Sequence, residues 1–266
     1  MQRTCILTDN SVQFIQAAFM GQDLVKVLPF SHNESKKIIN DQKYPASFSF
    51  QELVLRDFLA ALILEFENIL IITLSGTLSV LPVYLQNILD FLGKPGNIKL
   101  FNSRTTSIGL GVLVEKAAEL ASKGVSFREI DYLLRRSIPS IYTLLYLPDL
   151  EILAKANYLS LSQAVVGDML EIQPVFSLEN ECFTPIRKVH STRQVLEIFQ
   201  EFLDEFTEPY FAALVKANKQ SPVILKNGMN SSGSESRYRN IPMVSSLKDL
   251  LGPNAVGLFV AEGEFA

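Results

Sequence analysis

The chain of 266 residues contains few of the side chains that hold metal ions. It has two histidines, His32 and His190, which is too few for a multi-histidine metal site. Neither C-x-x-C nor H-E-x-x-H occurs, so the common zinc patterns are missing. We therefore expect no metal and no cofactor. The two cysteines, Cys5 and Cys182, lie beside apolar residues, which favours buried thiols over a disulfide.

Motifs for nucleotide and serine chemistry are also missing. The sequence contains no G-x-x-x-x-G-K-[ST] loop for a nucleoside triphosphate. A serine hydrolase elbow needs G-x-S-x-G, but in ITLSGT the position two residues before Ser75 is Thr73. A catalytic triad would also need His190 as its base, in a region that reads as the end of a strand. These absences count against an independent enzyme.

The charge balance and the apolar runs exclude two further classes. There are 24 Lys and Arg against 28 Asp and Glu, a net charge of -4, so no basic excess is available for nucleic acid. The segment MQRTCILTDN reaches Asp9 after one short apolar run, unlike a signal peptide. Runs at 59–64 and 69–74 are far shorter than the ~20 residues that span a bilayer. We expect a soluble cytoplasmic protein with no nucleic-acid partner and no integral membrane association.

Apolar residues make up 48% of the chain, and its length allows two domains with their own cores. In the first half, short apolar runs such as NILIITL and NIKLFN alternate with segments of helical periodicity at 50–66, 78–92 and 107–122. This alternation predicts βαβ units and a parallel sheet. The sequence therefore predicts an α/β fold with a first domain at residues 1–150.

After residue 149 the pattern changes. Two short helical segments precede EIQPVFSLE and ECFTPIRKVH, which read as two strands joined by a polar turn at Asn180. A long helix from about Thr192 to Phe206 follows, and YFAALVKAN and NAVGLFVAE are the last strand candidates. The segment KNGMNSSGSESRYRN is polar and reads as a surface loop. We predict a smaller α/β domain at residues 151–266.

Hydroxyl side chains gather where three predicted strands of the first domain end. In a parallel sheet these loops meet at one edge, where ligands bind and where helix N-termini attract anions. Ser, Thr and Asp at such positions also cap helices without touching a ligand, so both interpretations stay open. The residues concerned are Thr8, Asp9 and Ser11; Ser75, Thr77 and Ser79; and Ser103, Thr105, Thr106 and Ser107.

Three glycines accompany these loops. Gly76 follows Ser75, and Gly109 and Gly111 follow the hydroxyl cluster within a predicted helix, where each glycine costs roughly 1 kcal/mol relative to alanine. A glycine lacks a Cβ atom, so a ligand or another backbone can come close. Tight packing of a helix on the sheet explains them equally well.

Five segments resemble the DegV family of bacterial fatty-acid-binding proteins. ILTDNS looks like the family's I-x-T-D-S-S, ITLSGTLS is similar to its S-S-x-L-S loop, and LFNSRTTSIGLG resembles its D-S-R-x-x-S-x-G-x-G segment. LPDLEILAKANYLSLSQAVVGDMLEIQPVF and LLGPNAVGLFV resemble its D-L-x-x-L, Q-A-x-x-G and closing G-P-x-x-x-G segments. The matches follow one another in order over nearly the whole chain.

The resemblance implies an α/β/α N-terminal domain with a parallel sheet, a smaller C-terminal α/β domain with a mixed sheet, and a long-chain fatty acid between the two domains. Members of this kind present the carboxylate to a separate fatty acid kinase subunit and are not themselves catalytic. The implied carboxylate donors are Ser75 and the amide of Gly76, followed by Thr8, Ser103 and Thr106. Val165, Val166, Met169 and Leu170 are candidates for lining the tail, with ordinary core packing as the alternative.

Several positions depart from the family pattern. The threonine of the family's T-S-x-P-S loop corresponds to Gln42 or Pro45, and the aspartate of D-S-R is Asn102. A histidine found before the closing G-P in many members is Leu250, and His190 stands where an arginine is usual. These changes leave a second hypothesis open, a binding or sensing protein for a different amphiphile without a kinase partner.

Overall fold

The computed structural model describes residues 4–30, 50–93, 97–179, 182–221, 223 and 238–263. The chain divides into two compact units between Ile138 and Pro139. The sequence analysis places this boundary at residue 150. The difference arises because the strand β5 (Ile141–Tyr146) pairs with strands of the second unit.

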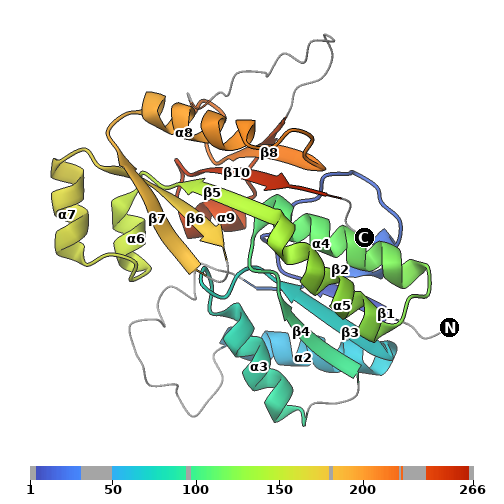
Figure 1. The fold of residues 1–266 in the computed structure, drawn as a ribbon. Helices are drawn as coiled ribbons and strands as arrows, with labels where there is room; N and C mark the ends of the chain where they lie inside the picture. Colours follow the sequence, from blue (N-terminus) through green and yellow to red (C-terminus); the bar gives the residue numbers. More distant parts are fainter. Residues whose placement is uncertain are drawn as a thin grey trace. The chain divides into compact units, whose positions relative to one another are not determined.

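The first unit is a parallel four-stranded sheet with the order β2-β1-β3-β4. Its strands are β1 (Thr4–Thr8), β2 (Val25–Val27), β3 (Asn68–Thr73) and β4 (Asn97–Asn102). Its α-helices are α2 (Phe50–Glu65), α3 (Leu81–Phe91), α4 (Ser107–Ser122) and α5 (Phe127–Ser137). Figure 1 shows α4 and α5 on one side of the sheet and α2 and α3 on the other. This confirms the predicted three-layer α/β/α architecture and its parallel sheet.

The buried strand β3 explains why the first half forms a three-layer unit. All six of its residues are buried, as expected for a parallel strand covered by helices on both faces. The predicted helices at 50–66, 78–92 and 107–122 are present as α2, α3 and α4. Pro82 lies in the first turn of α3, where its missing N–H is tolerated. Gly124 has a φ of 76° and follows the end of α4, where glycine tolerates this left-handed conformation.

Gly111 of α4 meets another segment of backbone. A Cβ atom at this position would overlap the carbonyl oxygen of Gln13. The same crossing is fixed by the amide of Gln13, which donates to the carbonyl oxygen of Ser107 at 3.1 Å. Of the two explanations for a glycine here, the close approach of a protein backbone therefore applies to Gly111.

The second unit contains a six-stranded mixed sheet with the order β7-β6-β5-β10-β8-β9. All of its neighbouring strands are antiparallel except β8 and β9. The strands other than β5 are β6 (Gln173–Glu179), β7 (Cys182–Val189), β8 (Phe211–Lys216), β9 (Arg239–Pro242) and β10 (Val256–Ala261). Its helices are α6 (Leu150–Lys155), α7 (Leu161–Met169), α8 (Thr192–Asp204) and α9 (Ser245–Leu251).

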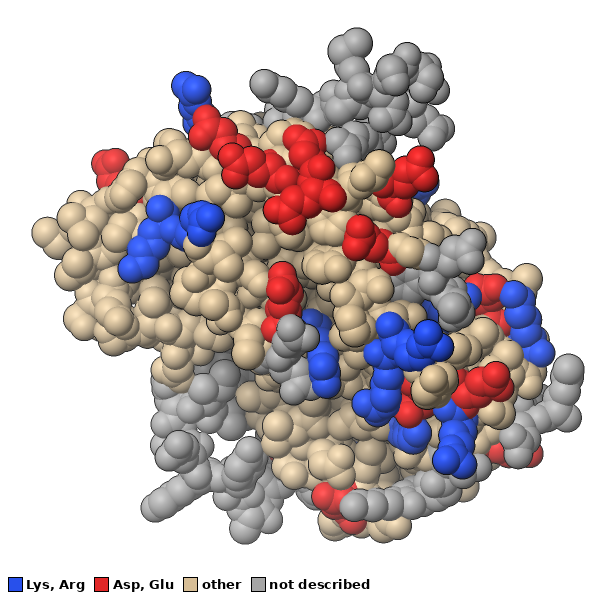
Figure 2. Space-filling view, in the orientation of Figure 1, with Lys and Arg blue, Asp and Glu red and all other residues tan. Residues whose placement is uncertain are grey.

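The core of the second unit lies between the sheet and α8. Val195, Phe199 and Leu203 of α8 are fully buried against residues of β5, β8 and β10, including Leu144, Leu214 and Leu258. The opposite face of α8 is acidic, and Figure 2 shows acidic side chains along it. The amphipathic pattern that predicts this helix from the sequence thus also gives the face it buries.

Some sequence predictions need correction or fall outside the described residues. Cys182 is exposed at the start of the edge strand β7, whereas Cys5 is buried as expected; both thiols are free. The sequence analysis missed α5, β9 and α9. Asn180 and most of the polar segment at 226–240 lie outside the described residues. Within the described part of the chain, no helix combines the length and apolar character needed to cross a membrane, and no cluster of His, Cys, Asp or Glu suits a metal ion.

Candidate functional site

The predicted head-group residues lie in three loops at the carboxyl edge of the first sheet. These loops follow β1, β3 and β4, which run parallel, with Thr8 beside Ile72 and Thr73 beside Asn102. Thr8, Ser75, Ser103 and Thr106 are at most 1% exposed, whereas Gly76 is exposed. The structure therefore brings the three predicted loops to one edge of the sheet.

Hydrogen bonds tie the three loops to one another. The buried carboxylate of Asp9 accepts hydrogen bonds from the amides of Ser11 at 2.9 Å and of Leu74 at 2.7 Å. The hydroxyl of Thr106 donates to Oγ of Ser11 at 3.3 Å. Bonds within and between loops of this kind fix the positions of the hydroxyls before any ligand arrives, which reduces the entropy that binding must offset.

The hydroxyls are used inside the loops more than as helix caps. Thr106 is the N-cap residue of α4 but makes no side-chain capping bond. Oγ of Ser75 lies 2.8 Å from Oγ1 of Thr77 and accepts from the Thr77 amide at 3.3 Å. Ser103 accepts from the Thr105 amide and donates to the Thr105 carbonyl. Ser79 is different, because its hydroxyl accepts from the amide of Leu81 at the start of α3.

Two buried hydroxyls at this edge have no hydrogen-bond partner among the described residues. They are Oγ1 of Thr8 and Oγ1 of Thr73, at the ends of neighbouring strands. The amide of Gly76, which is exposed, makes no backbone–backbone hydrogen bond within the described part of the chain. Buried polar groups without partners carry a desolvation penalty, and a bound polar ligand is one way to remove it.

The backbone of the loop after β4 has an uncommon conformation. Arg104 and Ser107 have φ angles of 58° and 53°, in the left-handed region that disfavours residues other than glycine. Residues held in this region occur often at binding sites. Arg104 is also the one basic residue in the segments 8–13, 73–79 and 102–107. Neutral N–H and O–H donors therefore form most of the polar surface of the three loops.

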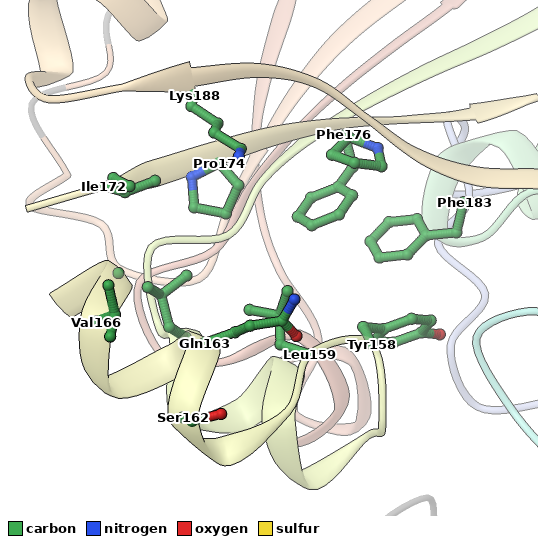
Figure 3. Close-up of a pocket in the computed structure, with 13 residues that line it drawn as sticks. Tyr158, Leu159, Ser162, Gln163, Val166, Ile172, Pro174, Phe176, Phe183 and Lys188 are labelled. Carbon is green, nitrogen blue, oxygen red and sulfur yellow. The ribbon is translucent and has the colours of Figure 1, made fainter. Parts of the chain in front are cut away.

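The second unit contains an apolar pocket of about 540 Å³. This volume lies within the range of about 300–1,000 Å³ that is typical of small-molecule sites. Figure 3 shows residues of α7 and of the connection before it on one side, and residues of β6, β7 and the position just before β6 on the other. We call these the helical side and the strand side. The helical side includes Leu150, Tyr158, Leu159, Gln163, Val166 and Gly167, and the strand side includes Ile172, Pro174, Phe176, Phe183, Pro185 and Lys188.

Aromatic rings form one end of this pocket. The rings of Phe176 and Phe183 are stacked with centroids 4.2 Å apart, and Tyr158 lies 4.7 Å from Phe183 (Figure 3). Burial raises the pKa of Tyr158 to about 12, as expected for a hydroxyl surrounded by apolar groups. The pocket is therefore suited to an uncharged, flexible apolar group.

The predicted tail residues occupy different positions. Val166 lines the pocket, whereas Val165, Met169 and Leu170 are not among its lining residues. All four are between 51% and 79% exposed, so core packing does not describe them here. Whether these four residues contact a ligand tail stays a prediction.

Sequence reasoning missed the strand side of the pocket. Alternation along β6 could have shown that Pro174 and Phe176 share a face. On β7 the alternation is broken by a register shift opposite Val175 and Phe176. Because of this bulge, Pro174 pairs with Lys188, and Phe176 pairs with Pro185. Regular alternation from Pro185 would place Arg187 on the pocket side of β7, but the structure places Lys188 there.

Comparison with known proteins places this geometry in a family. A family model described as "Uncharacterised protein, DegV family" matches residues 18–263. The chain belongs to the DegV family. A DegV domain-containing protein of Caldanaerobacter subterraneus is 22% identical over 235 residues, which is 86% of this chain and 83% of that protein. Protein DegV of Bacillus subtilis is 28% identical over 124 residues, 45% of this chain and 44% of that one.

Solved DegV structures share the fold of this chain. A fatty acid binding DegV family protein of Streptococcus agalactiae superposes with a TM-score of 0.75 at 19% identity, covering 99% of this chain and 100% of that one. The fatty acid kinase (Fak) B3 protein of Streptococcus pneumoniae, solved with linoleic acid, gives a TM-score of 0.73 at 15% identity, covering 98% and 99%. The mixed sheet of the second unit and the parallel sheet of the first agree with this family's two-domain architecture.

The departures from the DegV pattern are partly visible in the structure. Oδ1 of Asn102 accepts from the amide of Arg104 at 3.0 Å, a bond that needs no negative charge. Leu250 is half-buried on α9 and offers no polar group to a ligand. Nδ1 of His190 lies 3.1 Å from the carbonyl oxygen of Leu170 at the end of α7. Gln42 and Pro45 lie outside the described residues.

Proposed function

We propose that this protein binds a long-chain fatty acid. The hydroxyl loops of the first unit offer donors for a carboxylate, and the pocket of the second unit offers apolar volume for an acyl tail. The observation that carries the proposal is the apolar pocket of about 540 Å³ in a chain of the DegV family. Solved relatives described as fatty-acid-binding support it. A fatty acid needs both a large apolar volume and a few polar donors, and the chain contains both.

The tail provides most of the affinity in this proposal. At ~0.8 kcal/mol per buried methylene, about fifteen methylenes supply on the order of 10 kcal/mol before the ordering costs of binding. The carboxylate then needs two or three donors to compensate for its lost hydration. Ser75 and the Gly76 amide are the first donors we propose. Thr8, Ser103 and Thr106 are the second group, and the partnerless hydroxyl makes Thr8 the strongest of these.

We further propose that the chain is a non-catalytic subunit that presents the carboxylate to an ATP-dependent kinase, which forms the acyl phosphate. The sequence has no nucleotide-binding motif of the P-loop type, so the phosphoryl donor would be held by the partner. The Fak B3 protein of S. pneumoniae, a structural neighbour, is described as part of a fatty acid kinase.

A second candidate function is a binding or sensing protein for another amphiphile, without a kinase partner. Leu250 offers no head-group contact, and the aspartate of the family pattern is Asn102. Relative to the family pattern, the first change removes a polar group and the second removes a negative charge, which favours ligands with a different polar end.

Extraction of the purified protein with organic solvent, followed by mass spectrometry, separates the two candidates. A co-purifying C14 to C18 fatty acid supports the first, and another amphiphile supports the second. The loaded protein is then incubated with ATP, with and without a purified fatty acid kinase. Acyl phosphate only in the presence of the kinase supports the subunit role, whereas turnover by this chain alone contradicts it.

A further inference from the structure

Gly167 of α7 packs against the side chain of Leu150 of α6 at the wall of the pocket, and no space remains there for a larger residue at 167. Both residues line the pocket, and Leu150 is only 3% exposed. A Cβ atom added at Gly167 would lie 2.5 Å from Cδ1 of Leu150, which is closer than two non-bonded carbon atoms can approach. The present position of the Leu150 side chain therefore requires a residue without a side chain at 167.

The response of Leu150 to a larger residue follows from where it lies. Cδ1 is the end of a flexible side chain, so rotation about its side-chain bonds relieves the overlap at less cost than moving a helix. Interiors are close-packed, so a displaced side chain turns toward open volume. For Leu150 the open volume is the pocket that it lines.

We propose that Gly167 is a specificity-determining residue, which sets the length of acyl chain that the pocket accepts by allowing Leu150 to lie back from it. This proposal rests on the proposed function, because it concerns the same tail pocket. Each methylene of the acyl chain that is no longer buried raises the dissociation constant by about fourfold. A small loss of pocket volume therefore gives different affinities for acids that differ by a few carbons.

The test measures dissociation constants of lauric, palmitic and stearic acid for the full chain and three variants. For Gly167→Ala we expect stearic and palmitic acid to bind about tenfold more weakly, with lauric acid within about twofold of the wild type. Leu150→Val should leave or improve stearic acid binding, because it shortens the obstructing side chain. The double variant Gly167→Ala/Leu150→Val should restore most of the wild-type order of affinities.

Two controls keep the result interpretable. Alanine favours a helix more than glycine does, so Gly167→Ala should retain α7, which circular dichroism and thermal unfolding verify. Asp168→Ala, at the exposed neighbouring position, raises helix propensity without reaching Leu150 and should leave the ratios of the three acids unchanged. Unchanged ratios in Gly167→Ala, or equal weakening of all three acids, overturn the inference alone. Failure of the wild type to bind any of the acids overturns the proposed function and the inference with it.

Discussion

The main-chain amide of Ser75 donates a hydrogen bond to the carbonyl oxygen of Thr105 at 2.7 Å. This bond joins the loop after β3 to the loop after β4. The amide of Ser103 likewise donates to the carbonyl of Thr73 at 3.0 Å, so the two loops run together just beyond the sheet. Because the backbone at Ser75 is fixed in this way, its side chain can be removed without releasing the loop.

If Ser75 donates to the carboxylate as proposed, Ser75→Ala should weaken fatty-acid binding by roughly 1 to 3 kcal/mol, because one buried donor to a charged group is then lost. The backbone bond to Thr105 stays, so the free energy of unfolding should fall by about 1 kcal/mol or less. Titration with a fluorescent or isotopically labelled fatty acid measures the first quantity, and chemical denaturation measures the second.

Ser126→Ala is the matched control for this variant. Ser126 caps α5 by accepting from the amide of Glu129 at 3.3 Å, outside the three loops. Its removal should lower stability by about 1 kcal/mol and leave binding unchanged. If Ser75→Ala behaves like Ser126→Ala, Ser75 has a purely structural role.

Thr8→Val should lower fatty-acid affinity without lowering the stability of the ligand-free protein. Oγ1 of Thr8 is buried and has no partner among the described residues, and valine has nearly the same shape as threonine. Without ligand, the variant should therefore be as stable as the wild type or more stable by up to about 1 to 2 kcal/mol. If Thr8 donates to the carboxylate, fatty-acid affinity should fall at the same time.

Thermal unfolding with and without a saturating fatty acid measures both effects of Thr8→Val. The shift in melting temperature on adding ligand should be smaller for the variant than for the wild type. An equal ligand-induced shift would show that Thr8 does not contact the head group. Thr8→Ser keeps the hydroxyl and should bind like the wild type.

Local sequence patterns predicted most of the first unit, because β3 is a nearly continuous apolar run, β1 and β4 are short segments rich in apolar residues, and the helices between them have clear periodicity. They predicted the hydroxyl loops because the ends of parallel strands must meet at one edge. The pocket was harder to find. Its strand side depends on the bulge in β7, which changes the face on which Lys188 lies, and a bulge leaves no mark in a hydrophobicity pattern. Pairing of β5 with β10 is a contact between distant segments, so the boundary between the units was also beyond local reasoning.

Gly111→Ala should be strongly destabilising. A Cβ atom there would overlap the backbone carbonyl of Gln13, which unlike a side chain cannot turn aside. We expect a loss of at least about 3 kcal/mol in the free energy of unfolding, despite the gain of about 1 kcal/mol in helix propensity.

Gly76→Ala is the control variant. The nearest atoms to an added Cβ atom at Gly76 lie at 3.5 and 3.8 Å, so this variant should change the free energy of unfolding by no more than about 0.5 kcal/mol. Equal stability of the two variants would contradict the crossing of Gln13 over α4.

Asp131 should make the stability of the first unit depend on pH. Its carboxylate accepts from Nζ of Lys99 at 2.8 Å and from Nε and Nη2 of Arg135 at 3.2 Å each. Burial alone would raise the pKa of Asp131, but the hydrogen bonds from Lys99 and Arg135 outweigh it and hold the pKa below its usual value of 3.8. A lowered pKa means that the folded state binds the proton less readily than the unfolded state. The stabilisation is therefore complete above pH values near 4 to 5 and is lost as pH falls through the lowered pKa.

Asp131→Asn tests this sign. At pH 7 the variant should be less stable than the wild type by about 1 to 3 kcal/mol, because two cationic partners lose a charged acceptor. The difference should shrink as pH falls below about 4, where the carboxyl of the unfolded wild type becomes protonated and the folded state loses its advantage. Asp57→Asn removes a carboxylate of similar type from an exposed pair with Arg56 and should change stability by less than about 0.5 kcal/mol at either pH. A difference between Asp131→Asn and wild type that stays constant from pH 7 to pH 3 would contradict the role of the charge and leave only the shape of the side chain to explain the loss.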